Sequence, residues 1–487
     1  CIRDRYWCSP ASFFWRLPDQ AACLQGVTAD MNSGSGNDSF CRRERMLHRI
    51  SGPAGTSSPT RTGQWLANRK AGSMPITSPV TVNGRTYAAP KTCAVAICLD
   101  GCEPAYLEAA IARGLMPNLE RIRAKGTERI AHSVIPSFTN PNNMSIATGR
   151  PPAIHGICGN YLYEPETGEE VMMNDVRFLR APTIFSHYYA AGARVALVTA
   201  KDKLRALLGT GLSFDEDRAI CFSSQCADQA TKAEHGIENA STWLGRPVPE
   251  VYSAELSEFV FAAGVKILEE WNPDVLYLST TDYIQHKFAP DEDGALRFNA
   301  MVDGYLGKLD EMGAAIVLTA DHGMKPKHDA AGDPAVIYVQ DLMDEWLGKA
   351  AARVILPITD PYVVHHGALG SFATAYLPEG SDIGEIMSRL DAVDGIMLVV
   401  GRDEAVRRFE LPADRIGDIV IISDEQVTIG TSEDRHDLAA LKEPLRSHGG
   451  LTEQEVPFII NRQIDLPAAP ELRNFDAFYY AAVAASQ

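Results

Sequence analysis

Three short apolar runs in this chain each lead into an aspartate. The runs at 93–99 and 314–320 are followed directly by Asp100 and Asp321, and the run at 274–280 is followed by Asp282 after one threonine. Such runs, separated by amphipathic helical stretches, predict parallel strands buried between helices. Because ligands of open α/β sheets bind at the carboxyl ends of the strands, the three carboxylates are expected to meet at one edge of the sheet. Each aspartate alone is more often a turn residue or a helix cap.

Histidines accompany these aspartates. His286 stands four residues after Asp282, a spacing that places both side chains on one face of a helix. His322 directly follows Asp321, and His448 lies in an Arg-Ser-His-Gly-Gly segment near the end of the chain. Carboxylate and imidazole ligands together suit Zn²⁺, with Mn²⁺ or Fe²⁺ as substitutes. Six such ligands exceed the needs of one tetrahedral site and predict two metal ions that share a substrate oxygen.

Thr139 lies between the first two of these strands, where a turn-rich entry passes into a predicted helix that ends at Gly149. Threonine at a helix N-terminus is most often a cap, and for this residue alone the cap is the favoured interpretation. The alternative is a nucleophilic hydroxyl, for which the positive end of the helix dipole is a favourable place. A free hydroxyl is a poor nucleophile near neutral pH, and coordination to a metal ion activates it.

The order of these residues along the chain, with Asn160 after the threonine, resembles the alkaline phosphatase superfamily and, within it, the nucleotide pyrophosphatase/phosphodiesterase-like branch. The resemblance covers most of residues 90–487 and implies an α/β core with a largely parallel central sheet flanked by helices. It implies that Asn160 hydrogen-bonds a phosphoryl oxygen and that Thr139 is the nucleophile. The ligands it implies are Asp100, Thr139, Asp321 and His322 for one zinc ion, and Asp282, His286 and His448 for the other.

Three segments, 98–106, 136–143 and 199–205, resemble more closely the enzymes of that branch that split the carbon–phosphorus bond of phosphonoacetate into acetate and phosphate. On this resemblance, Lys201 and Lys203, which follow a predicted strand at 194–199, bind the substrate carboxylate. Without it, two lysines after a strand are most often solvated. The alternatives are a phosphodiesterase or nucleotide pyrophosphatase with the same metal site, and a non-catalytic phosphate-binding module.

The remaining histidines give weaker signals. His328, in a charged loop, is either a surface residue or a group that orients a metal ligand or contacts substrate, and its role stays open. The others are expected to be structural, namely His132, His155, His187, His365, His366 and His436.

The chain is expected to have three parts. Residues 1–73 carry ten basic and five acidic side chains and show no sustained apolar period, so we expect a non-native or disordered extension upstream of a natural start at Met74. A basic targeting arm is the alternative. The catalytic core is expected at 74–333 and 441–487, because the stretch between is too long for a loop and has its own helical and strand patterns. We expect residues 334–440 to form an inserted α+β cap domain.

The composition of the chain excludes several classes of binding partner. The net charge of −18 over 487 residues argues against a nucleic-acid partner, which needs clustered Lys and Arg. The apolar run at 93–99 is too short to span a bilayer. Ten cysteines without a C-x-x-C pair are typical of reduced thiols. We therefore expect a cytoplasmic enzyme that acts on a small phosphonate, with a homodimer as one form of the protein.

Overall fold

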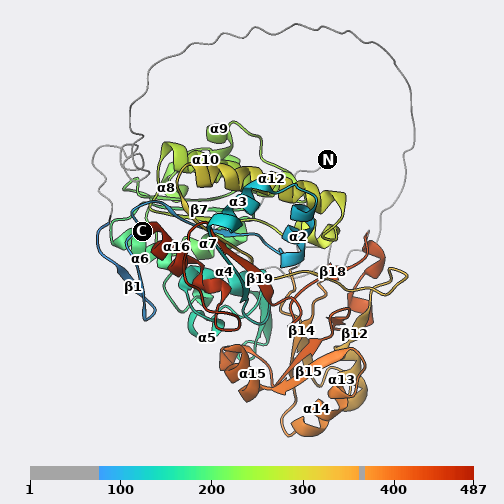
Figure 1. Ribbon diagram of the computed structural model, residues 1–487. Coiled ribbons are helices and arrows are strands. Elements are labelled where there is room, and N and C mark those ends of the chain that lie inside the picture. Colours follow the sequence, from blue (N-terminus) through green and yellow to red (C-terminus); the bar gives the residue numbers. More distant parts are fainter. Residues whose placement is uncertain (1–75, 361–367, 442) are drawn as a thin grey trace, which may run out of the picture. The chain divides into compact units, whose positions relative to one another are not determined.

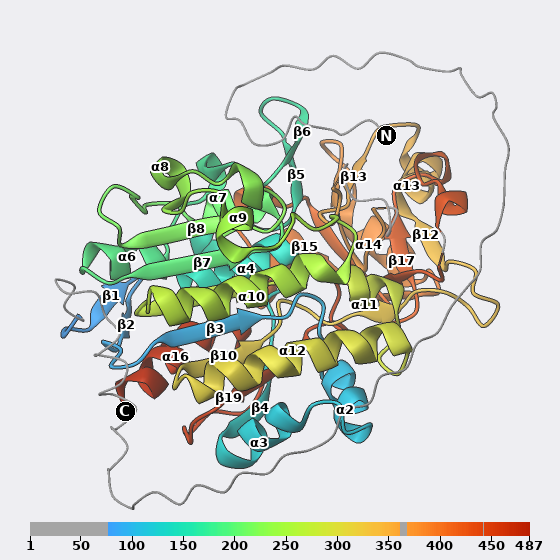
Figure 2. The same ribbon diagram turned by 90° about the horizontal axis from the view of Figure 1, so that it is seen from above.

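The computed structural model describes residues 76–360, 368–441 and 443–487, which belong to one compact unit. Its centre is a seven-stranded sheet in the order β4-β19-β10-β3-β9-β7-β8 (Figures 1 and 2). The strands are β3 (Ala94–Cys98), β4 (Thr127–His132), β7 (Val195–Thr199), β8 (Ala219–Ser223), β9 (Val275–Ser279), β10 (Ala315–Thr319) and β19 (Glu455–Ile460). The five strands β10, β3, β9, β7 and β8 are parallel. The expected α/β core with a largely parallel sheet is confirmed.

One strand runs against the others. β19 pairs antiparallel with β10 on one side and with β4 on the other. All but the first residue of β19 are buried, as are all residues of the parallel strands. An apolar run therefore marks a buried strand but does not tell its direction.

Helices cover both faces of this sheet because the strands are apolar on both faces. Figure 2 shows the long helices α10 (Ala254–Glu270) and α12 (Asp293–Glu311) over one face. The helices α4 (Thr139–Thr148) and α16 (Ala477–Ser486) lie against the other face, where α16 packs on β10 and β3 (Figure 1). Further helices of this part are α2 (Pro104–Ala112), α3 (Pro117–Lys125), α5 (Pro152–His155), α6 (Ile184–Ala190), α7 (Asp202–Leu208), α8 (Lys232–His235), α9 (Ala240–Leu244) and α11 (Tyr283–Lys287).

Residues 334–440 contain a second, smaller sheet. Four strands pair antiparallel in the order β13-β14-β16-β15, and β12 pairs in parallel with β17. The strands are β12 (Val336–Tyr338), β13 (Arg353–Ile355), β14 (Phe372–Tyr376), β15 (Ile396–Gly401), β16 (Ile419–Ser423) and β17 (Thr428–Gly430). The helices are α13 (Val339–Leu347), α14 (Ile383–Asp391) and α15 (Arg402–Phe409), and α14 packs against β15.

Three further pairs of short strands lie outside the two larger sheets. They are β1 (Val80–Val82) with β2 (Arg85–Tyr87), β5 (Tyr161–Glu164) with β6 (Glu169–Met172), and β11 (Lys325–Pro326) with β18 (Arg446–Ser447). The β11–β18 pair is antiparallel and joins the chain just after β10 to the chain just before His448. It brings two distant predicted ligand segments side by side.

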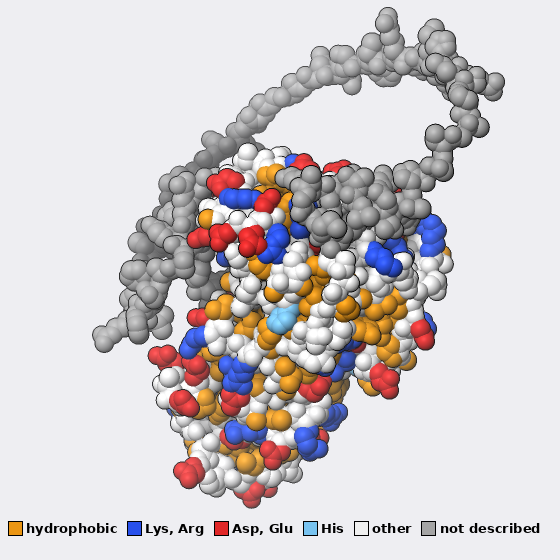
Figure 3. Space-filling model, turned by 90° about the vertical axis from the view of Figure 1, so that its left-hand side faces the viewer, with side chains coloured by type: hydrophobic (Ala, Val, Ile, Leu, Met, Phe, Trp, Pro, Cys, Tyr) orange, Lys and Arg blue, Asp and Glu red, His pale blue; other side chains and the backbone are white. Residues whose placement is uncertain are grey.

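Some of the segments for which the sequence raised expectations lie outside the residues that the structure describes. The expected extension at 1–73 lies outside them, as do His365 and His366. Among the described helices, none has the length and apolar character to cross a bilayer. The described part of the face in Figure 3 shows basic, acidic and apolar side chains interspersed. Five buried cysteines carry free thiols, namely Cys93, Cys98, Cys102, Cys158 and Cys221.

Candidate metal centre and its pocket

The three aspartates meet where the sequence places them, at the carboxyl ends of adjacent strands. Asp100 follows β3, which lies between β9 and β10, the strands that precede Asp282 and Asp321. Gly101 makes this approach possible. Its φ of +71° is left-handed, and a Cβ there would lie 3.0 Å from the Cβ of Asp282. The glycine after the first aspartate lets two strand ends come close enough for their carboxylates to share a site.

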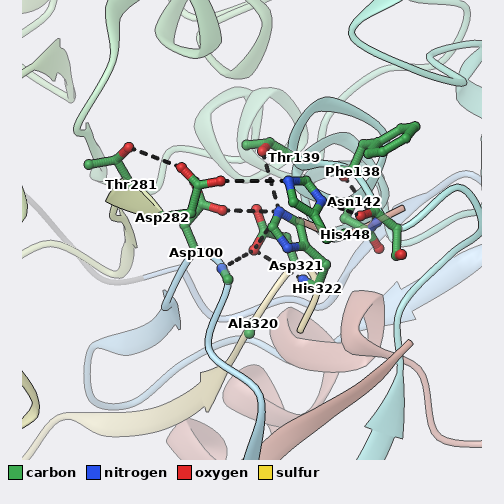
Figure 4. Close-up of polar contacts among 12 residues, drawn as sticks. Asp100, Phe138, Thr139, Asn142, Thr281, Asp282, Ala320, Asp321, His322 and His448 are labelled. Carbon is green, nitrogen blue, oxygen red and sulfur yellow. Dashed lines mark hydrogen bonds and ion pairs between the residues drawn. The ribbon is translucent and has the colours of Figure 1, made fainter. Parts of the chain in front are cut away.

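The predicted ligands form two adjoining clusters, and Figure 4 labels all of them except His286. In the first cluster, Nε2 of His322 lies 3.2 Å from Asp100 Oδ1, 3.9 Å from Asp321 Oδ1 and 3.5 Å from Thr139 Oγ1. These four residues are called the Asp321 cluster.

In the second cluster, Asp282 Oδ2 lies 2.9 Å from Nε2 of His286 and 3.7 Å from Nε2 of His448. These three residues are called the Asp282 cluster. Asp282 is the N-cap of α11 and His286 lies on that helix, so the predicted one-face spacing is confirmed.

Each histidine is fixed by its other ring nitrogen. Nδ1 of His286 lies 2.7 Å from the carbonyl oxygen of Arg446. Nδ1 of His322 lies 2.9 Å from the carbonyl oxygen of Gly323, and Nδ1 of His448 lies 2.8 Å from that of Ser137. A carbonyl oxygen only accepts, so Nδ1 carries the proton and donates. In the neutral ring Nε2 then has the free lone pair, and it faces the carboxylates, the arrangement found in metal-ligating histidines.

The clusters concentrate negative charge in a buried place. Burial and the neighbouring carboxylates of Asp282 and Asp321 raise the pKa of Asp100 well above its usual value. Burial lowers the pKa of His322, but Asp321 and Asp100 outweigh it and raise that pKa to about 10. Burial and the two other histidines lower the pKa of His448 well below its usual value. Several carboxylates this close are costly unless cations balance them.

The donor set fits metal ions. The ligand atoms of Asp282, His286 and His448 lie within 4.8 Å of one another, and so do those of Asp100, Asp282 and His322. The buried Oδ1 of Asp100 receives no hydrogen bond from the residues that the structure describes. A buried acceptor of this kind normally has a partner, and a cation would supply it. Mixed oxygen and nitrogen donors at this spacing can hold two divalent ions.

Thr139 does not act as the helix cap. The N-cap of α4 is Phe138, Thr139 is the first helical residue, and no side-chain cap bond is present. Its hydroxyl instead faces His322 and lines the pocket described next. The capping interpretation, which the sequence favoured for this residue alone, is wrong.

A single pocket joins the clusters to the predicted substrate residues. Its lining includes Asp100, Thr139, Asn160, Lys201, Lys203, Asp282, Ile358, Asp360 and His448. Asp321, His286 and His322 are buried and do not line it. Oδ1 of Asn160 accepts from the backbone N–H of Asn140 at 3.2 Å, which turns the amide nitrogen into the available donor.

The two lysines stand at one end of this pocket. Lys201 is the N-cap of α7, the helix that follows β7, and burial together with Lys203 lowers its pKa. Lys203 forms an ion pair with Asp360, whose side chain is only 4% exposed. The pocket therefore offers cationic groups next to the metal-type clusters. This end lies on the same rim of the sheet, as the sequence predicted.

Two pocket residues were missed at the sequence level. Asp360 and Ile358 come from the segment between β13 and β14, where no apolar period marks a function. Asn143 was also missed. Its Nδ2 donates to Asp321 Oδ2 at 3.0 Å, while its Oδ1 accepts from Tyr277 at 2.7 Å, so it orients a ligand carboxylate. The only available hint was an asparagine-rich helix start.

The histidines expected to be structural do not line the pocket, as far as the structure describes them. The buried His155 bonds Ser145 Oγ at 2.9 Å, and burial lowers its pKa to about 3. His436 accepts from the N–H of Thr431 at 2.9 Å. His328 contacts the carbonyl oxygen of Asp329 through Nδ1 and does not line the pocket.

Comparison with known proteins places this geometry in a family. Residues 94–451 match the family described as type I phosphodiesterase / nucleotide pyrophosphatase. The chain is 73% identical to the phosphonoacetate hydrolase of Sinorhizobium meliloti 1021, solved in complexes with phosphonoformate and with phosphonoacetate. Each match covers 84% of this chain and 100% of that one, with a TM-score of 0.83.

More distant relatives share the fold or part of the sequence. The murine ectonucleotide pyrophosphatase/phosphodiesterase 5 is 18% identical, with a TM-score of 0.55 over 81% of this chain and 95% of that one, which shows the fold alone. A venom phosphodiesterase of Macrovipera lebetinus is 25% identical over 240 residues, or 47% of this chain. That match spans only 25% of the venom protein's length.

Proposed function

The chain belongs to the type I phosphodiesterase/nucleotide pyrophosphatase family and, within it, to the phosphonoacetate hydrolases, and we propose that it cleaves phosphonoacetate to acetate and phosphate at a dinuclear zinc centre. One observation carries the proposal. The two ligand clusters, Thr139 and the lysine pair share a single pocket. This combination provides a place for a phosphonate and, beside it, a place for a carboxylate.

The Asp321 cluster would hold one zinc ion and the Asp282 cluster the other. When bound, the two ions would neutralise the phosphonate oxygens and lower the pKa of a coordinated hydroxyl or water. The same oxygen and nitrogen donors also suit Mn²⁺ or Fe²⁺ as substitutes. The hydrogen bonds from Nδ1 of the three histidines to carbonyl oxygens would keep each Nε2 directed at its ion.

Thr139 is the proposed nucleophile. Its hydroxyl gives its proton to water, Oγ1 forms a bond to phosphorus as the phosphorus–carbon bond breaks, and the electron pair of that bond leaves with the acetate carbon. The carbon then takes a proton to give acetate. Water attacks the phosphothreonine, the oxygen–phosphorus bond breaks, and phosphate and the free hydroxyl are restored. The position of Thr139 at the start of α4 favours negative charge on its oxygen.

Asn160 and the lysines would bind the substrate. The amide nitrogen of Asn160 is oriented to donate to a phosphonate oxygen, because its carbonyl oxygen is occupied by the N–H of Asn140. Lys201 and Lys203 would hold the carboxylate and stabilise the charge that develops on carbon. That charge is the difficult part of the reaction, since a carbanion is a poor leaving group.

The inserted segment would limit substrate size. We propose that residues 334–440 act as a cap on a catalytic core formed by 74–333 and 441–487, because Ile358 and Asp360 of this segment line the pocket. A capped pocket excludes water and favours small substrates. The cytoplasm is the proposed location, since acetate and phosphate are products that metabolism uses there.

Phosphate release decides between this proposal and its nearest competitor. Zinc-loaded protein is expected to release phosphate and acetate in equal amounts from phosphonoacetate, and to cleave a nitrophenyl nucleotide ester far more slowly. The opposite preference would assign the site to a phosphodiesterase or nucleotide pyrophosphatase. No turnover of either compound would leave a phosphate-binding module as the better account.

A further inference from the structure

A buried ion pair links the chain segments that follow two of the candidate ligands. Lys327 stands five residues after His322, and Glu453 stands five residues after His448. Both side chains are fully buried, and Lys327 Nζ lies 2.9 Å from Glu453 Oε1. His322 and His448 are therefore each followed, at the same distance along the chain, by one member of a single ion pair.

Glu453 contacts both ligand loops. Its backbone carbonyl oxygen accepts from the N–H of Gly323, the residue after His322, at 2.7 Å. Its Oε2 accepts from the N–H of Gly450, two residues after His448, at 2.9 Å. Gly323 is also the residue whose carbonyl oxygen binds Nδ1 of His322. One residue thus holds the loop of the Asp321 cluster and the loop of the Asp282 cluster.

Lys327 ties the same pair to the inserted segment. Besides Glu453, its Nζ donates to the carbonyl oxygen of Glu425 at 2.5 Å, in the turn between β16 and β17. Its backbone N–H donates to the carbonyl oxygen of Leu445 at 2.8 Å, next to the β11–β18 pair. The ammonium group therefore donates to one carboxylate and to one carbonyl oxygen, which belong to separate segments.

The two loops must keep a narrow spacing because their histidines are in contact. The rings of His322 and His448 stack with centroids 3.6 Å apart and planes 5° from parallel. Their Nε2 atoms belong to different clusters, so a shift of either loop changes the distance between the two metal positions. Metal ligands tolerate small errors of position poorly.

We propose that Glu453, with Lys327 as its counter-ion, is a positioning residue that sets the spacing of the two metal positions. This inference rests on the proposed dinuclear centre. A buried ion pair is weak evidence for a stabilising role, because removal from water offsets much of the attraction between the charges. A role in holding two loops in register explains why such a pair stands between them.

The informative variant is Glu453→Asp, which keeps the charge but shortens the side chain. The shorter carboxylate cannot contact both the N–H of Gly450 and Lys327 Nζ. In metal-free protein, amide hydrogen exchange is expected to accelerate at 446–450, where the N–H of Gly450 loses its acceptor, and at 321–327, where Lys327 loses its contact with the carboxylate. Zinc affinity, measured by competition with a chelator, is expected to fall about 10- to 100-fold.

Lys327→Met supplies a second test and Asp303→Asn a control. Lys327→Met leaves the buried carboxylate of Glu453 without its counter-ion and should lower zinc affinity. Adding Glu453→Gln is expected to restore part of that affinity, because no unpaired charge then remains. Asp303 is 3% exposed and accepts from the N–H of Leu119 at 2.7 Å, so Asp303→Asn is expected to lower the melting temperature without changing zinc affinity.

The inference is overturned if Glu453→Asp accelerates exchange only at 446–450 and leaves zinc affinity within about twofold of the parent. Glu453 would then stabilise one loop and position nothing. Parent protein that binds no zinc would refute the proposed centre, and the exchange data would still decide whether the two loops are coupled.

Discussion

The two ends of the pocket are built in different ways. At the metal end, the ligands follow buried strands or short loops, and backbone carbonyl oxygens fix all three histidines. Asp321 and His322 are fully buried there. At the lysine end, Lys203 is 22% exposed in its side chain and is held by one ion pair to Asp360. The metal end is fixed by the backbone, while the lysine end depends on long side chains from a helix and a loop.

This difference separates the reaction from the choice of substrate. The family includes phosphodiesterases and nucleotide pyrophosphatases, and the metal end suits any phosphoryl group. The lysine end is proposed to bind the group that is attached to the phosphorus, here the carboxylate of the substrate. Changes at the metal end should therefore affect turnover of every substrate, and changes at the lysine end should affect only substrates with a carboxylate.

The largest effect is expected for Thr139→Ala, because it removes the nucleophile and leaves the other ligands in place. Turnover of phosphonoacetate is expected to fall by about 10⁴-fold or more. Zinc content, measured on the purified protein, should stay near two ions per chain. Thr139→Ser keeps a hydroxyl and should retain measurable turnover. Turnover by the alanine variant at a level close to the parent would exclude Thr139 as the nucleophile.

His286→Ala tests the Asp282 cluster alone. Loss of one of three ligands is expected to lower zinc affinity at that position about 100-fold, so that the protein retains about one ion per chain after dialysis. Turnover of phosphonoacetate and of any phosphate ester should fall together. His328→Ala is the matched control, because His328 belongs to neither ligand cluster and its Nδ1 contacts the carbonyl oxygen of Asp329 instead. Equal zinc loss in both variants would contradict the cluster assignment.

Lys201→Met should weaken binding only at the lysine end of the pocket. Loss of a charge-assisted hydrogen bond to the carboxylate is expected to weaken phosphonoformate inhibition by about 10- to 100-fold. Inhibition by inorganic phosphate, which has no carboxylate, should change little. Competitive inhibition constants for the two compounds provide the measurement. A similar loss for both inhibitors would mean that Lys201 binds the phosphoryl group instead.

Asp360→Asn gives the smallest expected effect. It removes a negative charge beside Lys203, so anions with a carboxylate, such as phosphonoformate, should bind about threefold more tightly, as expected for a partly exposed pair. The gain should shrink at high salt, because mobile ions screen such charges. Inhibition constants at two ionic strengths test this. Weaker anion binding would show that Asp360 serves mainly to orient Lys203.

Much of the metal end could be predicted because its signals are local. A run of apolar residues predicts a buried strand, and the rule for parallel sheets places the residue after each strand at a common edge. Asp100, Asp282 and Asp321 follow from that rule. The histidines near these aspartates in the sequence then indicated a metal site, because carboxylate and imidazole together are typical zinc ligands. The fold class followed from the same runs, but the reversed direction of β19 did not, since its apolar pattern is equally suitable for either direction.

The remainder depends on contacts that no local pattern encodes. Asp360 meets Lys203 across 157 residues of sequence, from a segment without periodicity. Glu453 and Lys327 are charged residues in loops, and charged residues in loops are usually solvated. Asn143 orients Asp321 from a helix whose residues after Thr139 are all buried, so no polar face distinguishes it. These residues became visible only when distant segments were placed together.

The position of β19 also has a consequence for how the protein is made. This strand, at Glu455–Ile460, lies between β4 and β10, which are synthesised much earlier. A nascent chain on the ribosome already contains both neighbouring strands, but the sheet stays open between them until residues 455–460 have emerged. His448 appears only just before that strand. The complete ligand set of the proposed centre therefore cannot exist before His448 has been synthesised, so metal uptake at both positions would have to follow the synthesis of all five parallel strands.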